Sequence, residues 1–277
     1  MAPVADRVAV VTGGASGIGR ALCLALAGQG AAGVVVADLD GEGAAKVAAE
    51  IEAAGHRALA VTADVAREVD VRDLVARAEE AFGQVDLFFS NAGIIVGGGV
   101  EVPDEAWSRT WAVNVQSHIY VTRAVLPAML ERGDGYLIFT ASAAGLLTQL
   151  GSAPYSVTKH ALVALAEWLS ITHGDAGIKV SALCPQAVHS NLGATSRAQV
   201  PVGAVRPPGS TSSAAVDGVL TAERVAQVVL EAVADERFLI LPHPEVATYE
   251  QRRATDRERW LRGMRRLQAR LTQGGSR

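Results

Sequence analysis

Cysteine is scarce in this sequence, and the scarcity excludes two kinds of framework. Among 277 residues only Cys23 and Cys184 carry thiols. They lie far apart in segments predicted to be helix and strand, so neither a disulfide network nor a zinc site is implied. Few cysteines also suit a reducing compartment. We therefore expect a cytoplasmic protein without a bound metal.

Long hydrophobic runs and a strong charge bias are missing as well. No apolar run approaches the roughly 20 residues that cross a bilayer, and residues 1–6 lack the features of a secretory signal. The formal net charge of −4 provides no overall attraction to nucleic acid or anionic lipid. With 49% hydrophobic and 19% charged residues, the composition is that of a compact soluble protein.

Short apolar runs alternate with amphipathic segments along most of the chain. Such runs are typical of parallel strands that helices cover on both faces. They lie at residues 7–12, 33–38, 57–62, 86–90, 136–141, 179–183 and 238–241. The alternation predicts an α/β fold with a doubly wound parallel sheet in a three-layer α/β/α arrangement. We expect residues 1–277 to form one domain.

A glycine-rich turn follows the first predicted strand and opens the first predicted helix at residues 20–27. Its sequence is T-G-G-A-S-G-I-G at residues 12–19. Glycines there permit a tight turn and let the helix N-terminus approach a pyrophosphate. Glycines alone can simply shape a loop, so it is the strand before and the helix after that favour a dinucleotide site.

Asp38 ends the second predicted strand, about 20 residues beyond the glycines. A carboxylate at that place accepts both ribose hydroxyls and repels a 2′-phosphate, and neither Ser16 nor Leu39 adds a compensating positive charge. We therefore predict NAD rather than NADP; the alternative is a merely solvent-exposed aspartate. Asp64, after the third strand, is a candidate partner for the adenine amino group.

Tyr155 and Lys159 are spaced to share one face of a helix predicted over residues 155–169. A phenol titrates near pH ~10, and a neighbouring ammonium lowers that pKa toward the working range of a proton carrier. The chain has only three lysines, Lys46, Lys159 and Lys179, so this spacing is improbable by chance. The pair is our candidate for general acid/base catalysis.

Three further polar positions follow predicted strands or lie in helices. Ser142 comes after the fifth strand, where its hydroxyl can hold a substrate oxygen or simply form a turn. Asn114 lies in a long helix predicted over residues 104–130 and needs a polar partner, which a core amide would also find. N-A-G at 91–93 closes the fourth strand and lets the backbone pass close to a cofactor.

Together these motifs resemble the short-chain dehydrogenase/reductase superfamily in its compact one-domain branch. The resemblance covers about residues 6–241 and includes Y-S-V-T-K at 155–159. It implies a seven-stranded Rossmann sheet and hydride transfer between a nicotinamide and a substrate carbon while Tyr155 moves the proton. It also implies that Ser142 orients the substrate, that Lys159 grips the nicotinamide ribose and that Asn114 holds a water of a proton relay.

The resemblance also suggests which residues surround the ligands. The catalytic set is Asn114, Ser142, Tyr155 and Lys159. The predicted cofactor contacts are Gly13, Ser16, Gly17, Ile18, Gly19, Asp38, Leu39, Asp64, Val65, Asn91, Ala92, Gly93, Tyr155, Lys159, Pro185, Val188 and Ser190. The predicted substrate contacts are Ser142, Ala144, Gln149 and Gln186. Gln186 stands where the family usually has glycine, so we expect it to influence substrate preference.

Two segments differ in composition from the rest. Residues 190–218 are rich in small residues and contain two consecutive prolines, which predicts a long loop acting as a substrate lid, or a disordered segment. Residues 244–272 predict a helical tail with Trp260, Met264 and Leu267 on one face and arginines opposite. That helix would dock on its own domain or a neighbouring subunit; the alternative is a basic helix for nucleic acid or lipid.

The residues around the predicted site favour an apolar substrate. They are Ile94, Ile95, Val96, Ala143, Leu146, Leu147 and Leu150. We therefore expect an NAD-dependent oxidoreductase for a hydrophobic secondary alcohol or ketone, with no nucleic acid or membrane partner. The alternatives are an NADP-linked ketoreductase and a non-catalytic dinucleotide-binding sensor. Because the family commonly forms tetramers, the resemblance implies a homo-oligomer, with a tetramer favoured over a dimer.

Overall fold

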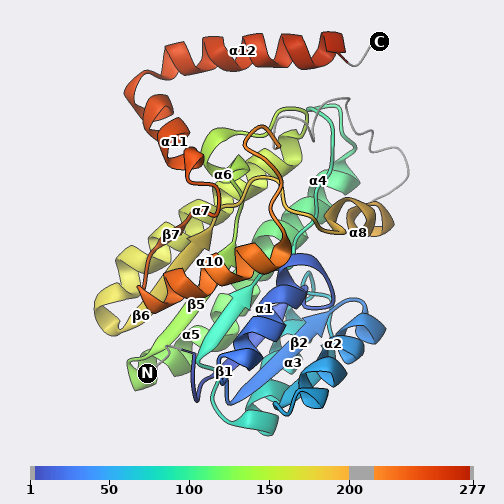
Figure 1. Cartoon of the computed structure of the whole chain (residues 1–277), viewed down its shortest axis with the longest axis vertical. Coiled ribbons are helices and arrows are strands. Elements are labelled where there is room, and N and C mark those ends of the chain that lie inside the picture. The colour runs from blue at the N-terminus through green and yellow to red at the C-terminus, as the bar shows by residue number, and fades with distance from the viewer. Residues whose placement is uncertain (1–3, 200–214, 275–277) are drawn as a thin grey trace.

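A parallel sheet of seven strands forms the centre of the molecule (Figure 1). The structure is a computed structural model that describes residues 4–199 and 215–274. The strand order is β3-β2-β1-β4-β5-β6-β7. The strands are β1 (Val8–Thr12), β2 (Gly33–Asp38), β3 (Ala58–Thr62), β4 (Leu87–Ser90), β5 (Gly135–Thr140), β6 (Ile178–Leu183) and β7 (Leu239–Ile240). The predicted Rossmann-type fold is confirmed.

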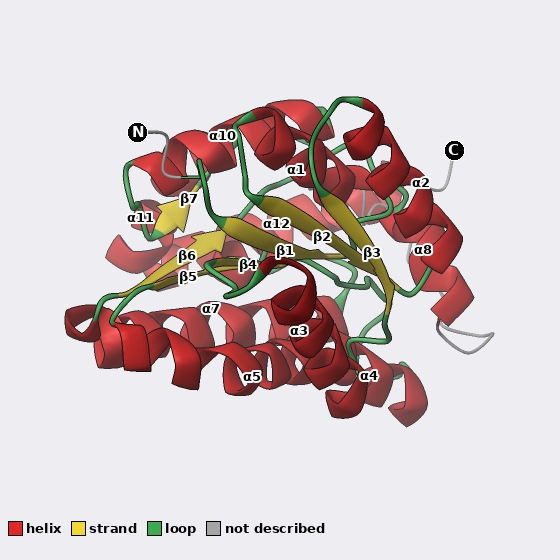
Figure 2. Cartoon of the chain, turned by 90° about the horizontal axis from the view of Figure 1, so that it is seen from below, coloured by secondary structure: helices red, strands yellow, loops and turns green. Residues whose placement is uncertain are grey.

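Helices cover both faces of this sheet (Figure 2). One face carries α1 (Gly17–Gly28), α2 (Gly41–Ala53) and α10 (Ala222–Ala234); the other carries α3 (Glu68–Phe82), α5 (Ser117–Arg132) and α7 (Ala153–His173). Neighbouring residues of a strand point to opposite faces, so Val10 packs into one core and Val11 into the other. Strand β3 differs from the prediction, because as an edge strand it is only partly buried.

The helix predicted over residues 104–130 is interrupted near its middle. It consists of α4 (Asp104–Trp111), a π-helical turn η1 (Ala112–Gln116) and α5. Asn114 lies within the π turn, where its side chain bonds the main chain of the residue Ile94. Turns of this kind are frequent at functional sites. The sequence carried no sign of it, because its residues fit an ordinary helix equally well.

The chain crosses from β1 to β2 on one side of the sheet and from β4 to β5 on the other. In an open parallel sheet such a reversal opens a crevice at the carboxyl ends of the strands. The glycine turn follows β1, N-A-G at 91–93 follows β4, and Ser142 follows β5. The fold therefore brings these motifs to one edge of the sheet.

The segment after β6 is not the structureless loop that the sequence predicts. A helix, α8 (Leu192–Gln199), lies within it, and the Asn191 carbonyl accepts from the N–H groups of Ala194 and Thr195 in its first turn. Residues 200–214 of the predicted lid lie outside the described residues. Val188, which precedes α8, and Leu220, which follows residue 214, form a parallel bridge. The short elements α6 (Ala144–Leu147) and η2 (Gly174–Ala176) complete the helices described before the tail.

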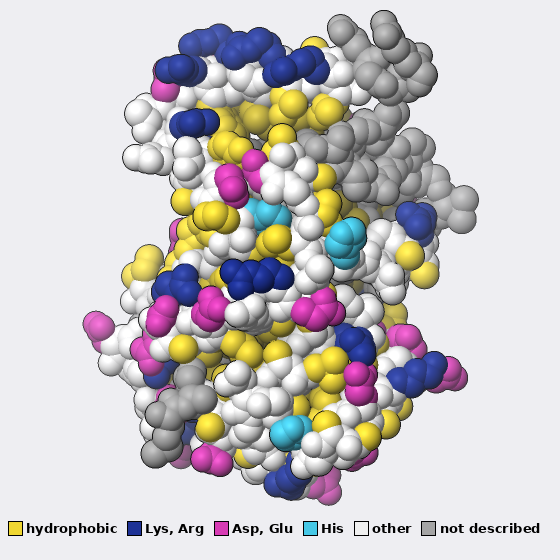
Figure 3. Space-filling view, viewed as in Figure 1, with side chains coloured by type: hydrophobic (Ala, Val, Ile, Leu, Met, Phe, Trp, Pro, Cys, Tyr) yellow, Lys and Arg dark blue, Asp and Glu magenta, His cyan; other side chains and the backbone are white. Residues whose placement is uncertain are grey.

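The predicted tail consists of two helices, α11 (Glu245–Thr255) and α12 (Arg257–Gly274). They are separated at Asp256, whose carboxylate accepts from the N–H of Arg259 and so caps the second helix. Figure 3 shows Lys and Arg side chains on the outer side of α12 and hydrophobic side chains beneath it. Among the described residues, no helix has the length and apolar character needed to span a membrane.

Candidate active site

The glycine turn leaves the N-terminus of α1 open to a ligand. Gly13 and Gly17 adopt φ angles of 68° and 51°, which side chains other than glycine rarely allow. A Cβ on Gly13 would lie 3.1 Å from the Cα of Ala92, so the turn packs closely against the loop after β4. Ser16 caps the helix without a side-chain hydrogen bond. The first N–H groups of α1 therefore suit an anion such as a pyrophosphate.

Asp38 lies beside this turn with its carboxylate fixed by the main chain. One oxygen accepts from the N–H of Ala15 at 3.0 Å and the other from the N–H of Asp40 at 3.0 Å. Each carboxylate oxygen retains a further lone pair that a hydroxyl can use. Leu39 is 48% exposed and adds no charge. The geometry thus fits an acceptor for a sugar diol.

Asn91 ties the ends of three strands together. Its N–H donates to Thr12 Oγ1 at 3.0 Å, and its side-chain amide donates to the Thr12 carbonyl at 2.9 Å. Its Oδ1 accepts from Thr140 Oγ1 at 3.0 Å. The amide of Asn91 is therefore used within the protein, and it holds β1, β4 and β5 in register at the edge of the crevice.

Ser142 and Tyr155 meet at the carboxyl end of β5. Helix α7 starts with Pro154 in its first turn, where a missing N–H costs nothing, and this places Tyr155 at the start of the helix. Burial raises the pKa of Tyr155, while a hydrogen bond with Ser142 lowers it in part. The two side chains are 8% and 9% exposed. Ser142 Oγ also accepts from the N–H of Ala144 at 3.1 Å.

Lys159 lies one helical turn beyond Tyr155 and is almost completely buried. Its ammonium is 5.7 Å from the centre of the Tyr155 ring and donates to the Thr140 carbonyl at 2.7 Å. Burial lowers the pKa of Lys159 to about 8. The raised pKa of Tyr155 is opposite to the direction that the spacing predicts, because burial outweighs the polar interactions around the phenol.

Asn114 and Lys159 flank one small space beside Gly93. A Cβ on Gly93 would lie 3.3 Å from Lys159 Nζ and 3.4 Å from Asn114 Oδ1. The Asn114 side chain accepts from Ile94 N–H and donates to the Ile94 carbonyl, both at 2.8 Å, and it also donates to Thr158 Oγ1. The amide hydrogens are thereby used, and only Oδ1 keeps a free lone pair on this side chain.

Known proteins resemble this chain in sequence and in fold. The family model described as short chain dehydrogenase matches residues 7–201. The chain belongs to the short-chain dehydrogenase family. Two curated relatives are 1-deoxy-11-beta-hydroxypentalenate dehydrogenase of Streptomyces exfoliatus, with 38% identity over 86% of this chain and 84% of that protein, and cyclohexanol dehydrogenase of an Acinetobacter species, with 36% identity over 68% of this chain and 75% of that protein.

A solved member of the family has nearly the same fold. It is a short-chain dehydrogenase/reductase from Burkholderia phymatum in complex with NAD, with a TM-score of 0.85 and 34% identity. The match covers 93% of this chain and 96% of that one. The chain is thus an oxidoreductase of the short-chain dehydrogenase type. The names of the two curated relatives describe dehydrogenases of hydroxyl compounds.

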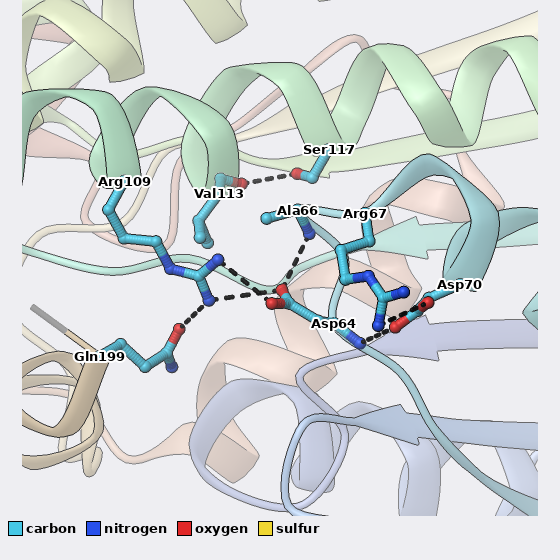
Figure 4. Close-up of polar contacts among 8 residues, drawn as sticks. All are labelled: Asp64, Ala66, Arg67, Asp70, Arg109, Val113, Ser117 and Gln199. Carbon is cyan, nitrogen blue, oxygen red and sulfur yellow. Dashed lines mark hydrogen bonds and ion pairs between the residues drawn. The ribbon is translucent and has the colours of Figure 1, made fainter. Parts of the chain in front are cut away.

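Asp64 is already engaged by a residue that the sequence did not single out. Its carboxylate forms two bonds with the Arg109 guanidinium, at 3.2 and 3.3 Å, and also accepts from the N–H of Ala66 (Figure 4). Arg109 comes from α4 and is 45 positions away in the chain. Such a long-range pair leaves no signal in the local sequence pattern.

Gln186 turns toward the tail of this short-chain dehydrogenase. Its amide nitrogen donates to the Asp217 carboxylate at 2.9 Å, and Tyr249 from α11 donates to the other Asp217 oxygen at 2.9 Å. The N–H of Gln186 donates to Nδ1 of the buried His243 at 3.2 Å. Sequence reasoning missed Asp217, His243 and Tyr249, because they act only through this three-dimensional contact.

The remaining predicted contacts lie around this edge of the sheet in different surroundings. Ser190 lies beside the glycine turn, since a Cβ on Gly17 would be 3.1 Å from its Cβ. Gln149 donates its N–H to Ser156 Oγ of α7 and its side-chain amide to the Leu150 carbonyl. Ile94 is part of the hydrophobic core, as are Ala143 and Leu146. The buried residues near the site include Val65, Ala143, Ala144 and Leu146; Ile18, Pro185 and Val188 border the same edge of the sheet.

Metal-binding side chains do not cluster here. Within residues 4–199 and 215–274, no three histidine, cysteine, aspartate or glutamate side chains lie where they could share an ion. Cys184 is buried beside the site, and burial raises the pKa of its thiol to about 12. A thiol with that pKa stays protonated and inert near neutral pH.

Proposed function

We propose that this chain is an NAD-dependent dehydrogenase for hydrophobic secondary alcohols, with Tyr155 as the general acid/base. The observation that supports the proposal most directly is the position of Tyr155, which is buried next to the Ser142 hydroxyl, with the Lys159 ammonium 5.7 Å from its ring, on the same sheet edge as the glycine turn. A proton carrier and a hydroxyl able to hold the substrate oxygen are thereby adjacent.

The catalytic groups divide the work as follows. Ser142 Oγ holds the substrate oxygen, and Tyr155 Oη takes its proton during oxidation or returns it during reduction. A bound nicotinamide would supply or accept the hydride. Lys159 provides a positive charge that offsets the phenolate formed on Tyr155. A water held between Lys159 Nζ and Asn114 Oδ1, beside Gly93, would carry the proton onward.

The proposal includes NAD as the preferred cofactor. Asp38 presents a carboxylate at the end of β2 beside the open N-terminus of α1. The negative charge and the lack of a neighbouring arginine or lysine at Ser16 or Leu39 disfavour a 2′-phosphate. The Burkholderia phymatum protein, which matches nearly the whole chain, was solved with NAD. Gly13, Gly17 and Gly19 would accommodate the pyrophosphate.

Apolar surface supports the proposed substrate class and self-association. Ala143, Leu146 and the partly buried Leu147 lie directly after Ser142, which favours an apolar substrate body.

On the outside, Trp168 and Ile171 of α7 are 57% and 84% exposed. Large exposed apolar side chains mark interaction surfaces. We propose that copies of this chain associate through α7.

A panel of secondary alcohols supplied with NAD or NADP tests this function. Turnover is read as nicotinamide absorbance for the wild-type chain and for Tyr155→Phe. The proposal expects oxidation of cyclic and other apolar alcohols with NAD, and loss of it in the variant. Turnover with NADP alone would favour the ketoreductase alternative. NAD binding without turnover across the panel would favour the sensor.

A further inference from the structure

Two side-chain contacts attach helix α8 to the body of the molecule. Ser196 Oγ accepts from the N–H of Ile95 at 2.9 Å, and the Ser196 side chain is buried. At the end of the helix, Gln199 Oε1 accepts from Arg109 Nη2 at 3.0 Å. Helix α8 therefore sits over the connection between β4 and α4, next to the candidate active site.

Arg109 also reaches the carboxyl end of β3. Its Nη1 and Nη2 donate to the two oxygens of Asp64, and the same Nη2 donates to Gln199, as Figure 4 shows. Asp64 is oriented in turn by its own N–H, which donates to Asp70 at 3.1 Å. The Arg109 and Asp64 side chains are 24% and 23% exposed, so solvent screens the pair only partly. One guanidinium thus joins the strand edge to α8.

We propose that Arg109 is a positioning residue through which the adenine end of a bound dinucleotide holds α8 in place. The inference rests on the proposed function and on the predicted role of Asp64 as an acceptor for the adenine amino group. Asp64 has capacity for that extra donor while Arg109 stays bound, because a carboxylate offers about four acceptor sites and three are used. An additional donor fixes the carboxylate, which fixes the guanidinium fork and its bond to Gln199.

The coupling has a consequence for the order of binding. If the dinucleotide stabilises the docked α8, a docked α8 must by linkage raise the affinity for the dinucleotide by the same factor. The helix begins two residues after Ser190, which lies against the glycine turn. The cofactor would therefore organise the substrate side of the site before an alcohol enters.

Hydrogen exchange of the full chain, with and without NAD, tests this inference. We expect NAD to slow exchange in residues 192–199 by about tenfold, the size of one charge-assisted hydrogen bond. Arg109→Leu should abolish that slowing, and Arg109→Lys should restore only part of it, since an ammonium lacks the guanidinium fork. Gln199→Ala should abolish the slowing in α8 and, by the same linkage, weaken NAD binding by up to about tenfold.

Arg67 provides the matched control. It lies in the same cluster (Figure 4) but pairs with Asp70 and its side chain is 66% exposed. Arg67→Leu should leave the NAD effect on α8 unchanged. An equal NAD effect in Arg109→Leu and wild type, or equal loss in Arg67→Leu, would overturn the inference. Alcohol oxidation is measured on the same samples: a wild-type chain that shows the effect without turnover contradicts the proposed reaction but supports the coupling through Arg109.

Discussion

The edge of the sheet formed by β1, β4 and β5 differs from the segment after β6 in what holds it together. On the sheet edge, Asp38, Asn91 and Lys159 all bond main-chain groups. After β6 several contacts join one side chain to another, as between Gln186 and Asp217 or between Arg109 and Gln199. Any sequence with this fold supplies main-chain partners, whereas side-chain partners depend on particular residues. The sheet edge, which we call the cofactor edge after the proposed function, therefore depends mainly on the fold, and the segment after β6 depends on particular side chains.

The largest effect should come from removing the phenol on the cofactor edge. Tyr155→Phe deletes the proposed proton carrier, and general acid/base catalysis contributes about 10²- to 10⁴-fold. We expect kcat to fall within that range while the affinity for NAD, measured by titration, stays unchanged. Tyr120→Phe, on a partly buried tyrosine of α5, is the matched control. A variant that keeps more than a tenth of wild-type kcat would contradict the role of Tyr155.

The next largest effect should come from removing the Asp38 carboxylate on the same edge. Asp38→Ser removes the proposed ribose acceptor, and a bond to a charged group is worth about 1.5–3 kcal/mol. NAD should therefore bind about 10- to 100-fold more weakly, while the kcat/KM ratio of NADP to NAD rises. Asp40→Ser, two residues on, keeps a helix-capping hydroxyl and should change neither quantity. An unaltered cofactor ratio in Asp38→Ser would refute the preference for NAD.

The sheet edge was predictable from sequence because each motif follows a short apolar strand. Carboxyl ends of parallel strands meet at one edge, so Ser142, Tyr155 and the glycine turn could be placed together without coordinates. The π turn at Asn114 and the helix α8 could not, since their residues suit several backbone states. Arg109 could not be found either, because its partners follow from packing rather than from spacing.

A pH profile probes the burial of Lys159 on the cofactor edge. With its pKa lowered to about 8, Lys159 carries its proton below that pH and loses it above. Tyr155, whose pKa burial raises, remains the protonated donor. We expect kcat/KM for ketone reduction to be level well below pH 8, to be about half of that level near pH 8 and to be about a tenth of it one unit higher. In Lys159→Arg this fall should vanish, because a guanidinium stays charged. Persistence of the fall in that variant would assign it to another group.

The smallest effect should come from the segment after β6, when Gln186 is replaced. Gln186→Gly restores the residue usual in the family and removes one of the two bonds that the described residues make to the Asp217 side chain, leaving the bond from Tyr249. One hydrogen bond of this kind contributes about 0.5–3 kcal/mol, discounted here because the groups are partly exposed. We expect KM for alcohols to change a few-fold, unequally between small and bulky substrates, with NAD affinity constant.

Gln186 could alter the alcohol profile by holding Asp217 or by contacting the substrate directly, and Tyr249→Phe separates these two explanations. This variant removes the hydrogen bond that Tyr249 of α11 donates to Asp217. If Gln186 acts by holding Asp217, both variants should shift the alcohol profile in the same direction, and the double variant should add little, because the two bonds meet on one carboxylate. If Gln186 instead contacts the substrate directly, only Gln186→Gly should alter the profile. Weakened NAD binding with an unchanged profile would exclude both and would assign Gln186 to the cofactor edge, against the division between the two regions.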